Sequence, residues 1–583
     1  MTDDALSTAV ADGYAFEGPA LELGTLMLDA ATLSDVRIRI PLGMLNRHGL
    51  VAGATGTGKT KTLQLLAEQL SDAGVPVFAA DVKGDLSGLL APGASNEKVA
   101  ERAKDVGQDW RGRGFPVEFF ALGGHGTGIP LRVTMSAFGP VLLSKVLGLN
   151  DTQESSLGLV FHYADKAGLP LLDLADLREV VKYLTSDEGK ADLEDLGGLS
   201  SSTAGVILRE LIAFSDQGAD AFFGEPEFET ADFLRVLPGS TGAGGGNGVI
   251  SLVELPDLQD RPAVFSTFLM WLLADLFHDL PEVGDVEVPK LVFFFDEAHL
   301  LFADASKAFL DSVAQTVRLI RSKGVGVVFV TQSPTDVPDD VLAQLGSRIQ
   351  HQLRAHTPND AKALRKTVDT YPTSGYPDLA EVLTSLGIGE AVVTVMNERG
   401  APTPVAWTRL RAPESLMAAA EPAALDKAVT SSPLFAKYAE PVDRESAREK
   451  LAAKLEKGAA KAAEESAREG AAKSEPEPAR SSRRPRREPD SMVEQVVKST
   501  AFRQVMRTAA REIVRGIFKT GRRGAGRCAW ARWWRRSRPR REKGCHGRED
   551  TRVRCPADLR AAGAGGRGRR GRRGRPRVRR RPA

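Results

Sequence analysis

Residues 53 to 60 read Gly-Ala-Thr-Gly-Thr-Gly-Lys-Thr. The stretch fits the pattern G-x-x-x-x-G-K-[ST], and it lies between the apolar run 50–52 and a helical pattern over 61–70. Glycines in this pattern let backbone N–H groups surround phosphates, and the positive end of the following helix dipole points at them. The sequence therefore predicts a phosphate loop that binds a nucleoside triphosphate, ATP. The predicted nucleotide-binding residues are Gly53, Ala54, Thr55, Gly56, Thr57, Gly58, Lys59, Thr60 and Lys61.

Two side chains of this loop have predicted roles beyond shape. We expect Lys59 to neutralise phosphate charge and the Thr60 hydroxyl to ligate Mg²⁺. An ordinary glycine-rich turn is the alternative for the octamer alone, and the strand and helix patterns on either side argue against it.

A second element, Leu291 to Glu297, is a continuous apolar run that ends in two acids. Such a run is typical of a buried central strand in a parallel sheet, which delivers carboxylates to its carboxyl edge. Asp296 is the predicted metal ligand, and Glu297 is predicted to orient and activate the attacking water. A helix cap or a surface pair is the alternative reading of the two acids.

Two further catalytic candidates follow along the chain. A predicted strand over 326–330 precedes Gln332, which we expect beside the γ-phosphate as a sensor of hydrolysis, or else as an ordinary strand-end polar group. Before that strand, Arg318 and Arg321 lie near the end of an amphipathic segment. Cations there stabilise a helix C-terminus, which is the simple explanation. The alternative is an arginine finger in a neighbouring subunit's site, for which we favour Arg321.

These motifs together resemble the HerA/FtsK branch of phosphate-loop ATPases, in particular bacterial HerA-like proteins of the YjgR type. The resemblance spans residues 35 to 410 and is carried by the segments 48–60, 81–85 (Asp-Val-Lys-Gly-Asp), 295–299 (Phe-Asp-Glu-Ala-His) and 330–334 (Val-Thr-Gln-Ser-Pro). It implies an α/β fold with a RecA-like P-loop NTPase core and a mostly parallel sheet. It also implies a ring-shaped homo-oligomer, suspected to be a hexamer, and ATP-driven movement on double-stranded DNA. HerA itself has an N-terminal β-barrel, for which the stretch before Gly53 is expected to be too short, so a nuclease partner is not transferred.

Composition favours a large cytoplasmic enzyme. The 583 residues are 42% hydrophobic, enough for a large core. The start has acids in place of the basic residues of a signal peptide. The longest apolar candidate, residues 265–277, is too short for a bilayer and contains Asp275, so no transmembrane segment is expected.

The formal net charge of +2 hides an uneven distribution. Residues 521–583 hold 24 Lys and Arg against 4 Asp and Glu, while residues 1–520 hold 54 against 72. The acidic body does not support DNA binding by a broad basic surface, so DNA would have to meet local basic loops. The tail has 23 Arg but no Phe, Ile, Met, Tyr, Asn or Gln, as expected if a GC-rich gene were read out of frame. A frameshifted tail and a genuine disordered basic extension both stay open.

Changes of pattern predict the organisation of the chain. In order, we expect an N-terminal segment (1–35), the first part of the ATPase core (36–140), a helical insertion (141–236), the second part of the core (237–412), a charged helix with a disordered linker (413–490), a basic amphipathic helix (491–520) and the Arg-rich tail (521–583). Predicted strands include 36–41, 49–53, 75–81, 117–122, 249–255, 349–355, and a hairpin of 390–396 with 403–410. Arg348 and Arg354 flank one of them, where they would be solvated or face a neighbour's nucleotide.

Two function classes follow. The first is a ring-shaped ATPase that moves double-stranded DNA. The second is an ATP-dependent switch or scaffold that recruits a protein partner through the 491–520 helix without moving DNA. DNA as the substrate comes from the family resemblance alone.

Overall fold

A computed structural model of the chain describes residues 3–29, 31–123, 126–193, 196–238, 246–255, 262–302, 307–372 and 374–472. The predicted basic helix 491–520 and the Arg-rich tail 521–583 lie outside these residues. Within them, no helix is both long enough and apolar enough to span a membrane.

Twelve strands in the described part of the chain form one sheet, in the order β2-β1-β14-β13-β12-β3-β11-β10-β4-β9-β5-β6. Neighbouring strands from β12 to β6 are parallel, and the strands from β2 to β13 join antiparallel at one end. The strands are β1 Ala20–Leu28, β2 Ala31–Pro41, β3 Gly49–Ala52, β4 Val77–Asp81, β5 Val117–Leu122, β6 Ile129–Leu131, β9 Ile250–Glu254, β10 Leu291–Phe295, β11 Val325–Thr331, β12 Ser347–Gln350, β13 Glu390–Thr394 and β14 Ala406–Leu410; β7 Val236–Pro238 and β8 Gly246–Gly248 pair separately.

Helices follow the strands as expected for an α/β fold. They are α1 Asp3–Gly13, α2 Lys59–Asp72, α3 Glu97–Asp105, α4 Met135–Val146, α5 Asp151–Lys166, α6 Leu174–Thr185, α7 Asp187–Asp192, α8 Ser201–Asp216, α9 Pro262–Asp279, α10 His299–Phe302, α11 Lys307–Ile320, α12 Asp339–Leu342, α13 Pro358–Val368, α14 Leu379–Ser385, α15 Pro422–Ser431, α16 Pro433–Tyr438 and α17 Ala447–Ala472. The short 3₁₀ helices η1 Leu42–Arg47 and η7 Arg321–Lys323 precede β3 and β11. The mostly parallel sheet of the predicted fold class is confirmed.

The central strands form the core because their sequences are apolar on both faces. Every residue of β3, β4, β10 and β11 is buried. The rings of Phe78 on β4 and Phe293 on β10 pack with centroids 4.9 Å apart. A strand buried on both sides is typical of a parallel sheet covered by helices. Because β10 is held in this way, the two acids that follow it are held at the carboxyl edge of the sheet.

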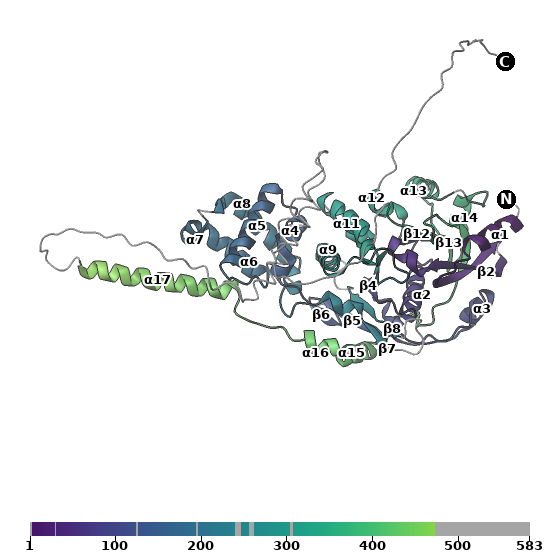
Figure 1. Ribbon diagram of the computed structural model, residues 1–583, viewed down its shortest axis with the longest axis horizontal. Helices are drawn as coiled ribbons and strands as arrows, with labels where there is room; N and C mark the ends of the chain where they lie inside the picture. The colour runs from purple at the N-terminus through teal and green to yellow at the C-terminus, as the bar shows by residue number, and fades with distance from the viewer. Residues whose placement is uncertain are drawn as a thin grey trace, which may run out of the picture. The chain divides into compact units, whose positions relative to one another are not determined.

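Helices α4 to α8 cluster together beside the β5 and β6 end of the sheet, and all but the start of α4 lie within the stretch 141–236, where a helical insertion is predicted (Figure 1). Local sequence starts several of them. Thr134, Asn150, Asp173 and Ser200 each accept a backbone N–H from the first turn of the helix that follows. Such caps satisfy N–H groups that have no partner inside the helix.

The chain after the predicted boundary at 413 packs on the core. The backbone N–H groups of Glu414 and Ser415 each donate to the Glu68 carboxylate of α2, at 2.9 Å. Farther on, Tyr438 is buried and its hydroxyl donates to Asp232 at 2.6 Å. These contacts could not be predicted from the composition of the segment, which is rich in Ala and charged residues, because each contact depends on a single polar or aromatic residue.

Candidate active site

The phosphate loop connects β3 to α2 and is held by its neighbours on both sides. The Gly53 N–H donates to the Thr331 carbonyl at 3.2 Å, and the Ala54 N–H donates to the Gln352 carbonyl at 2.9 Å. A Cβ on Gly53 would lie 2.5 Å from the Cβ of His351, so a larger residue there would displace the support of the loop. Glycine is therefore required at position 53 for a steric reason.

Lys59 and Lys61 begin α2 beneath this loop. The Lys59 ammonium donates to the carbonyls of Gly53 at 2.7 Å and Ala54 at 3.3 Å, and its side chain is buried. Burial lowers the pKa of Lys59, although the Glu297 carboxylate acts in the opposite direction. Burial also lowers the pKa of Lys61, against the opposing charge of Asp85. The Lys59 ammonium therefore lies within the loop, where a phosphate would restore the lost solvation of its charge.

The two acids follow β10 at the carboxyl edge of the sheet. The Glu297 N–H donates to the Asp296 carboxylate at 2.9 Å, and both residues are buried. Burial, together with the charge of Glu297, raises the pKa of Asp296 to about 6. Burial alone would raise the pKa of Glu297, but its bond to the Lys83 ammonium brings that pKa below the ordinary value.

Glu297 has a backbone conformation that is rare for a residue with a side chain, and its carboxylate lies between Lys83 and His299. Its φ of 47° lies in the left-handed region, which costs a residue with a side chain about 1 kcal/mol or more. Its carboxylate forms an ion pair with Lys83, and its other oxygen lies 3.2 Å from Nδ1 of His299. A strained residue is often found at a catalytic position, because the fold holds its side chain in one place.

Gln332 follows β11, the strand between β3 and β10. Since Thr331 pairs with Ala52, Gln332 continues the strand beside the start of the phosphate loop. Its side chain is exposed. The strand order therefore brings the phosphate loop, the two acids and Gln332 to one edge, as ligand sites in parallel sheets usually lie.

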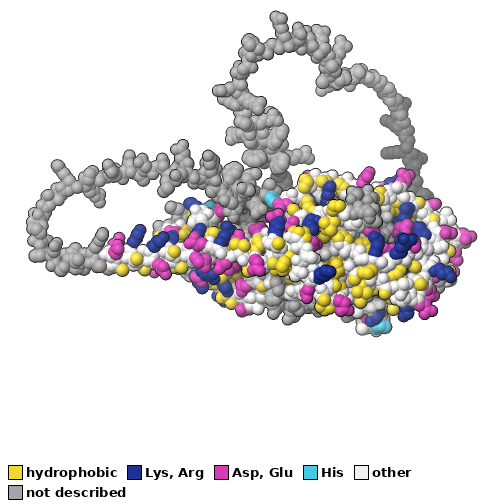
Figure 2. Space-filling model, turned by 90° about the horizontal axis from the view of Figure 1, so that it is seen from below, with side chains coloured by type: hydrophobic (Ala, Val, Ile, Leu, Met, Phe, Trp, Pro, Cys, Tyr) yellow, Lys and Arg dark blue, Asp and Glu magenta, His cyan; other side chains and the backbone are white. Residues whose placement is uncertain are grey.

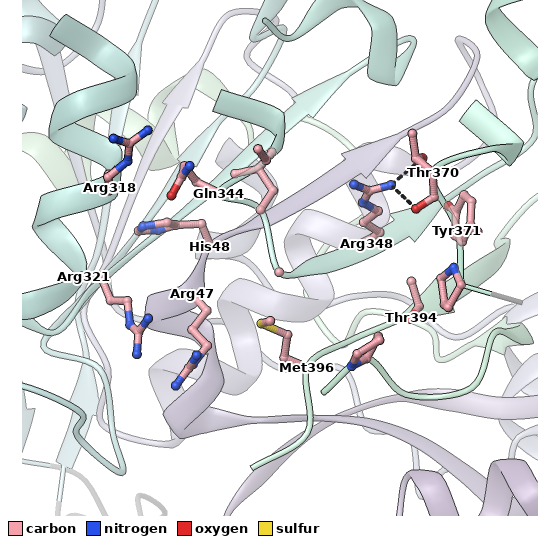
Figure 3. A pocket seen from close by; sticks show the side chains of 15 residues that line it. Arg47, His48, Arg318, Arg321, Gln344, Arg348, Thr370, Tyr371, Thr394 and Met396 are labelled. Atoms are coloured by element: carbon pink, nitrogen blue, oxygen red, sulfur yellow. Dashed lines mark hydrogen bonds between the residues drawn. The ribbon is translucent and has the colours of Figure 1, made fainter. Parts of the chain in front are cut away.

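Arg321 is not part of this group, because it lies at the opposite edge of the same sheet. A cavity of ≈ 630 Å³ is lined there by Arg47, Arg318, Arg321 and Arg348, which come from η1, α11, η7 and β12 (Figure 3). In Figure 3 the guanidinium groups of Arg47 and Arg321 lie side by side, and both contact Asp285, at 3.8 and 2.8 Å. Burial lowers the pKa of the neighbouring His48 to about 4, so the arginines supply the positive charge of this cavity.

Arg354 differs from the other candidate arginines. Its guanidinium donates to the carbonyl of Thr55 at 3.2 Å, in the phosphate loop of its own chain. The predicted strand 349–355 in fact ends at Gln350, because the chain then turns to support the loop through His351 and Gln352. Arg354 therefore contacts the phosphate loop of its own chain.

The sequence analysis missed His351 and gave no role to Lys83. His351 is fully buried, its Nε2 lies 2.9 Å from the Thr62 hydroxyl, and its Nδ1 lies 2.9 Å from the Glu390 carbonyl. It thereby connects β12 to the helix of the phosphate loop. The Asp81 carboxylate caps the turn before Lys83, because it accepts the N–H groups of Lys83, Gly84 and Leu86. Lys83 could have been predicted to lie at this edge of the sheet, because it comes two residues after the predicted strand 75–81.

Comparisons with known proteins agree with this geometry. The family described as "Helicase HerA-like C-terminal" matches residues 27–525. The DNA double-strand break repair helicase HerA of Sulfurisphaera tokodaii is 23% identical over 377 residues, which cover 64% of this chain and 66% of that protein. The same-named protein of Saccharolobus solfataricus is 22% identical over 378 residues, with the same coverage of both chains. The chain thus spans slightly less than two thirds of the length of these curated relatives.

Among solved structures, the bacterial conjugative coupling protein TrwBdeltaN70 is similar to this chain with a TM-score of 0.46 and 17% sequence identity. The match covers 72% of this chain and 94% of the TrwB chain.

Proposed function

Since this chain belongs to the family of HerA-like helicases, we propose that it is an ATPase that moves double-stranded DNA as a ring-shaped homo-oligomer, a hexamer. The observation that carries the ATPase assignment is the meeting of the phosphate loop with Asp296 and Glu297 at the carboxyl ends of β3 and β10. Hydrolysis of a phosphoanhydride needs positioned charge and an oriented water more than covalent chemistry. This edge offers both.

Each predicted site residue has a place in this proposal. Residues 53 to 61 bind the phosphates of ATP, with Lys59 turning from the loop carbonyls toward the β- and γ-phosphates. Glu297 orients the attacking water and takes its proton. Gln332, exposed beside the loop, senses the γ-phosphate.

Thr60 and Asp296 suit a magnesium ion. Burial, and then the charge of the adjacent Glu297 carboxylate, raise the pKa of Asp296, and a divalent cation relieves both effects. The described residues contain no cluster of three or more His, Cys, Asp or Glu that could hold a metal. A phosphate-loop site does not require one, because phosphate oxygens and waters complete the shell of Mg²⁺. Bound there, Mg²⁺ would neutralise charge on the β- and γ-phosphates.

We further propose that Arg321 acts on the nucleotide of a neighbouring subunit. Arg321 precedes β11, whereas the phosphate loop follows β3. Along β11, seven residues of about 3.3 Å each separate the two edges by roughly 23 Å. A head-to-tail ring places the amino edge of one copy against the carboxyl edge of the next. The cavity with Arg47, Arg318 and Arg348 would then surround the γ-phosphate with positive charge.

Mixed rings test this placement. We expect Arg321→Ala and Glu297→Gln subunits to be nearly inactive alone, because an arginine finger contributes about 10³-fold or more to the rate. Mixed together, they should regain measurable ATP turnover, since some boundaries then join an intact Glu297 to an intact Arg321. Turnover is measured after subunit exchange has been demonstrated with labelled copies.

The matched control for this experiment is Arg365→Ala, which removes an exposed arginine of α13 outside the cavity. It should keep the parental rate alone. If exchanging rings of Arg321→Ala and Glu297→Gln show no recovery, Arg321 is a helix-end cation, and Arg47, Arg318 and Arg348 become the candidates for the role in trans.

DNA as the substrate is supported by the family and not by a broad basic surface. Lysine, arginine and acidic side chains are interspersed on the face seen in Figure 2. The alternative function, an ATP-dependent switch that recruits a protein partner, depends on the 491–520 helix, which lies outside the described residues. A cytoplasmic location stays a prediction from the sequence.

A further inference from the structure

Lys83 forms an ion pair with the carboxylate proposed to activate water. It lies two residues beyond β4, and its ammonium contacts Oε1 of Glu297, which follows β10. The two strands are direct neighbours in the sheet. A carboxylate bound to an ammonium has one oxygen less for a water molecule. The contact thus acts on the group that the reaction needs free.

The loop that presents Lys83 is built by specific hydrogen bonds. The Asp81 carboxylate accepts the N–H groups of Lys83 at 3.2 Å, Gly84 at 2.8 Å and Leu86 at 2.7 Å. Gly84 has a φ of 75°, a conformation that glycine adopts at low cost. The Ser87 hydroxyl donates to the Gly84 carbonyl at 2.8 Å. The backbone position of Lys83 is therefore fixed, and only its side chain needs to move for the ion pair to break.

The two partners differ in their access to solvent. The Glu297 side chain is 6% exposed, whereas the Lys83 side chain is 40% exposed. Glu297 also keeps a second polar neighbour, Nδ1 of His299 at 3.2 Å, which stays in place if Lys83 leaves. A group that breaks the pair from outside must therefore bind Lys83, and a group that competes for an ammonium is an anion.

We propose that Lys83 is a positioning residue that holds the Glu297 carboxylate away from the attacking water until a phosphate of the DNA backbone binds its ammonium. The proposal rests on the proposed function, because it takes Glu297 as the residue that activates water. It connects polymer binding to hydrolysis: a ring without DNA keeps its carboxylates paired, and contact with DNA releases them. DNA that binds the unpaired state of Lys83 more tightly would raise the fraction of sites in which the Glu297 carboxylate is free.

The test is steady-state ATP turnover of the full chain carrying Lys83→Met, with and without linear duplex DNA. Methionine keeps most of the length of the side chain and removes its charge. We expect kcat without DNA to rise by about threefold to tenfold, as expected for loss of a partly exposed ion pair, with little change in KM. Added DNA should then stimulate the variant less than the parent. Lys83→Arg should restore low turnover without DNA.

Lys366→Met is the matched control, because Lys366 forms an exposed ion pair with Asp339 at 3.2 Å. It should leave turnover and its stimulation unchanged. A fall of kcat in Lys83→Met, or no change with thermal stability and nucleotide binding intact, would overturn the proposal. A rise in kcat with undiminished stimulation would support the hold on Glu297 and contradict its release by DNA. Failure of the underlying function is seen separately, as full turnover in Glu297→Gln alone.

Discussion

Lys59→Ala is expected to weaken ATP binding by about 100-fold or more and to remove measurable turnover at ordinary ATP concentrations. The removed ammonium is buried and lies within the phosphate loop, where it donates to the carbonyls of Gly53 and Ala54. A charge-assisted hydrogen bond to phosphate contributes about 3 kcal/mol, which corresponds to that factor in affinity. The measurement is a titration with a fluorescent ATP analogue, followed by steady-state turnover.

The control for Lys59→Ala is Lys98→Ala, which removes an exposed ammonium from α3. It should bind and hydrolyse ATP as the parent does. Thermal melting separates lost binding from lost folding, since the Lys59 variant should still unfold in one transition. Unchanged ATP affinity in a folded Lys59→Ala variant would contradict the assignment of the phosphate loop.

Glu297→Gln should keep ATP binding and lose turnover by about 10²-fold to 10⁴-fold. The amide has the shape of the carboxylate but cannot take a proton from the attacking water, a contribution of that size in general base catalysis. The same change removes the ion pair with Lys83, so binding is expected to be equal or slightly tighter. Rapid mixing with ATP, followed by measurement of released phosphate, distinguishes the lost chemical step from slow product release.

Glu118→Gln is the matched change elsewhere in the same sheet. Glu118 lies on β5 and pairs with Arg235 at 3.0 Å, so its loss should lower thermal stability slightly and leave turnover intact. Parental turnover in a folded Glu297→Gln variant would move the role of the base to another acid of this edge. Buried Glu254, which ends β9 and pairs with Asp81, would be the first to test.

The meeting of the candidate site residues at the carboxyl edge was predictable because it depends on short, continuous motifs. Each motif can be identified from eight residues or fewer: the phosphate loop, the strand that ends in Asp296 and Glu297, and the strand before Gln332. Strand β5, at 117–122, has the predicted bounds for the same reason, since five of its six residues are buried in an apolar run. No local pattern contains the order of these strands, which the folded sheet establishes.

The features of the fold and the site that could not be predicted from the sequence depend on contacts between residues far apart in the chain. Strand β1 consists largely of Leu and Met, which favour helices, and it pairs so closely with β14 that a Cβ on Gly24 would lie 2.0 Å from the Arg409 carbonyl oxygen. The arginine cavity joins residues as far apart as Arg47 and Arg348. The ion pair of Lys83 joins the ends of two strands more than two hundred residues apart. Each of these contacts exists only after the sheet has formed.

The central claim, an ATPase that moves on DNA, is tested most directly by ATP turnover of the full chain with and without linear duplex DNA, with Glu297→Gln as the blank. Turnover should be present without DNA and should rise when DNA is added, in a manner that weakens as salt is increased, because phosphate contacts release counterions. Single-stranded DNA and RNA of equal charge show whether the response is specific to the duplex. Intact turnover that no nucleic acid alters would contradict the motor and favour the switch that recruits a protein partner.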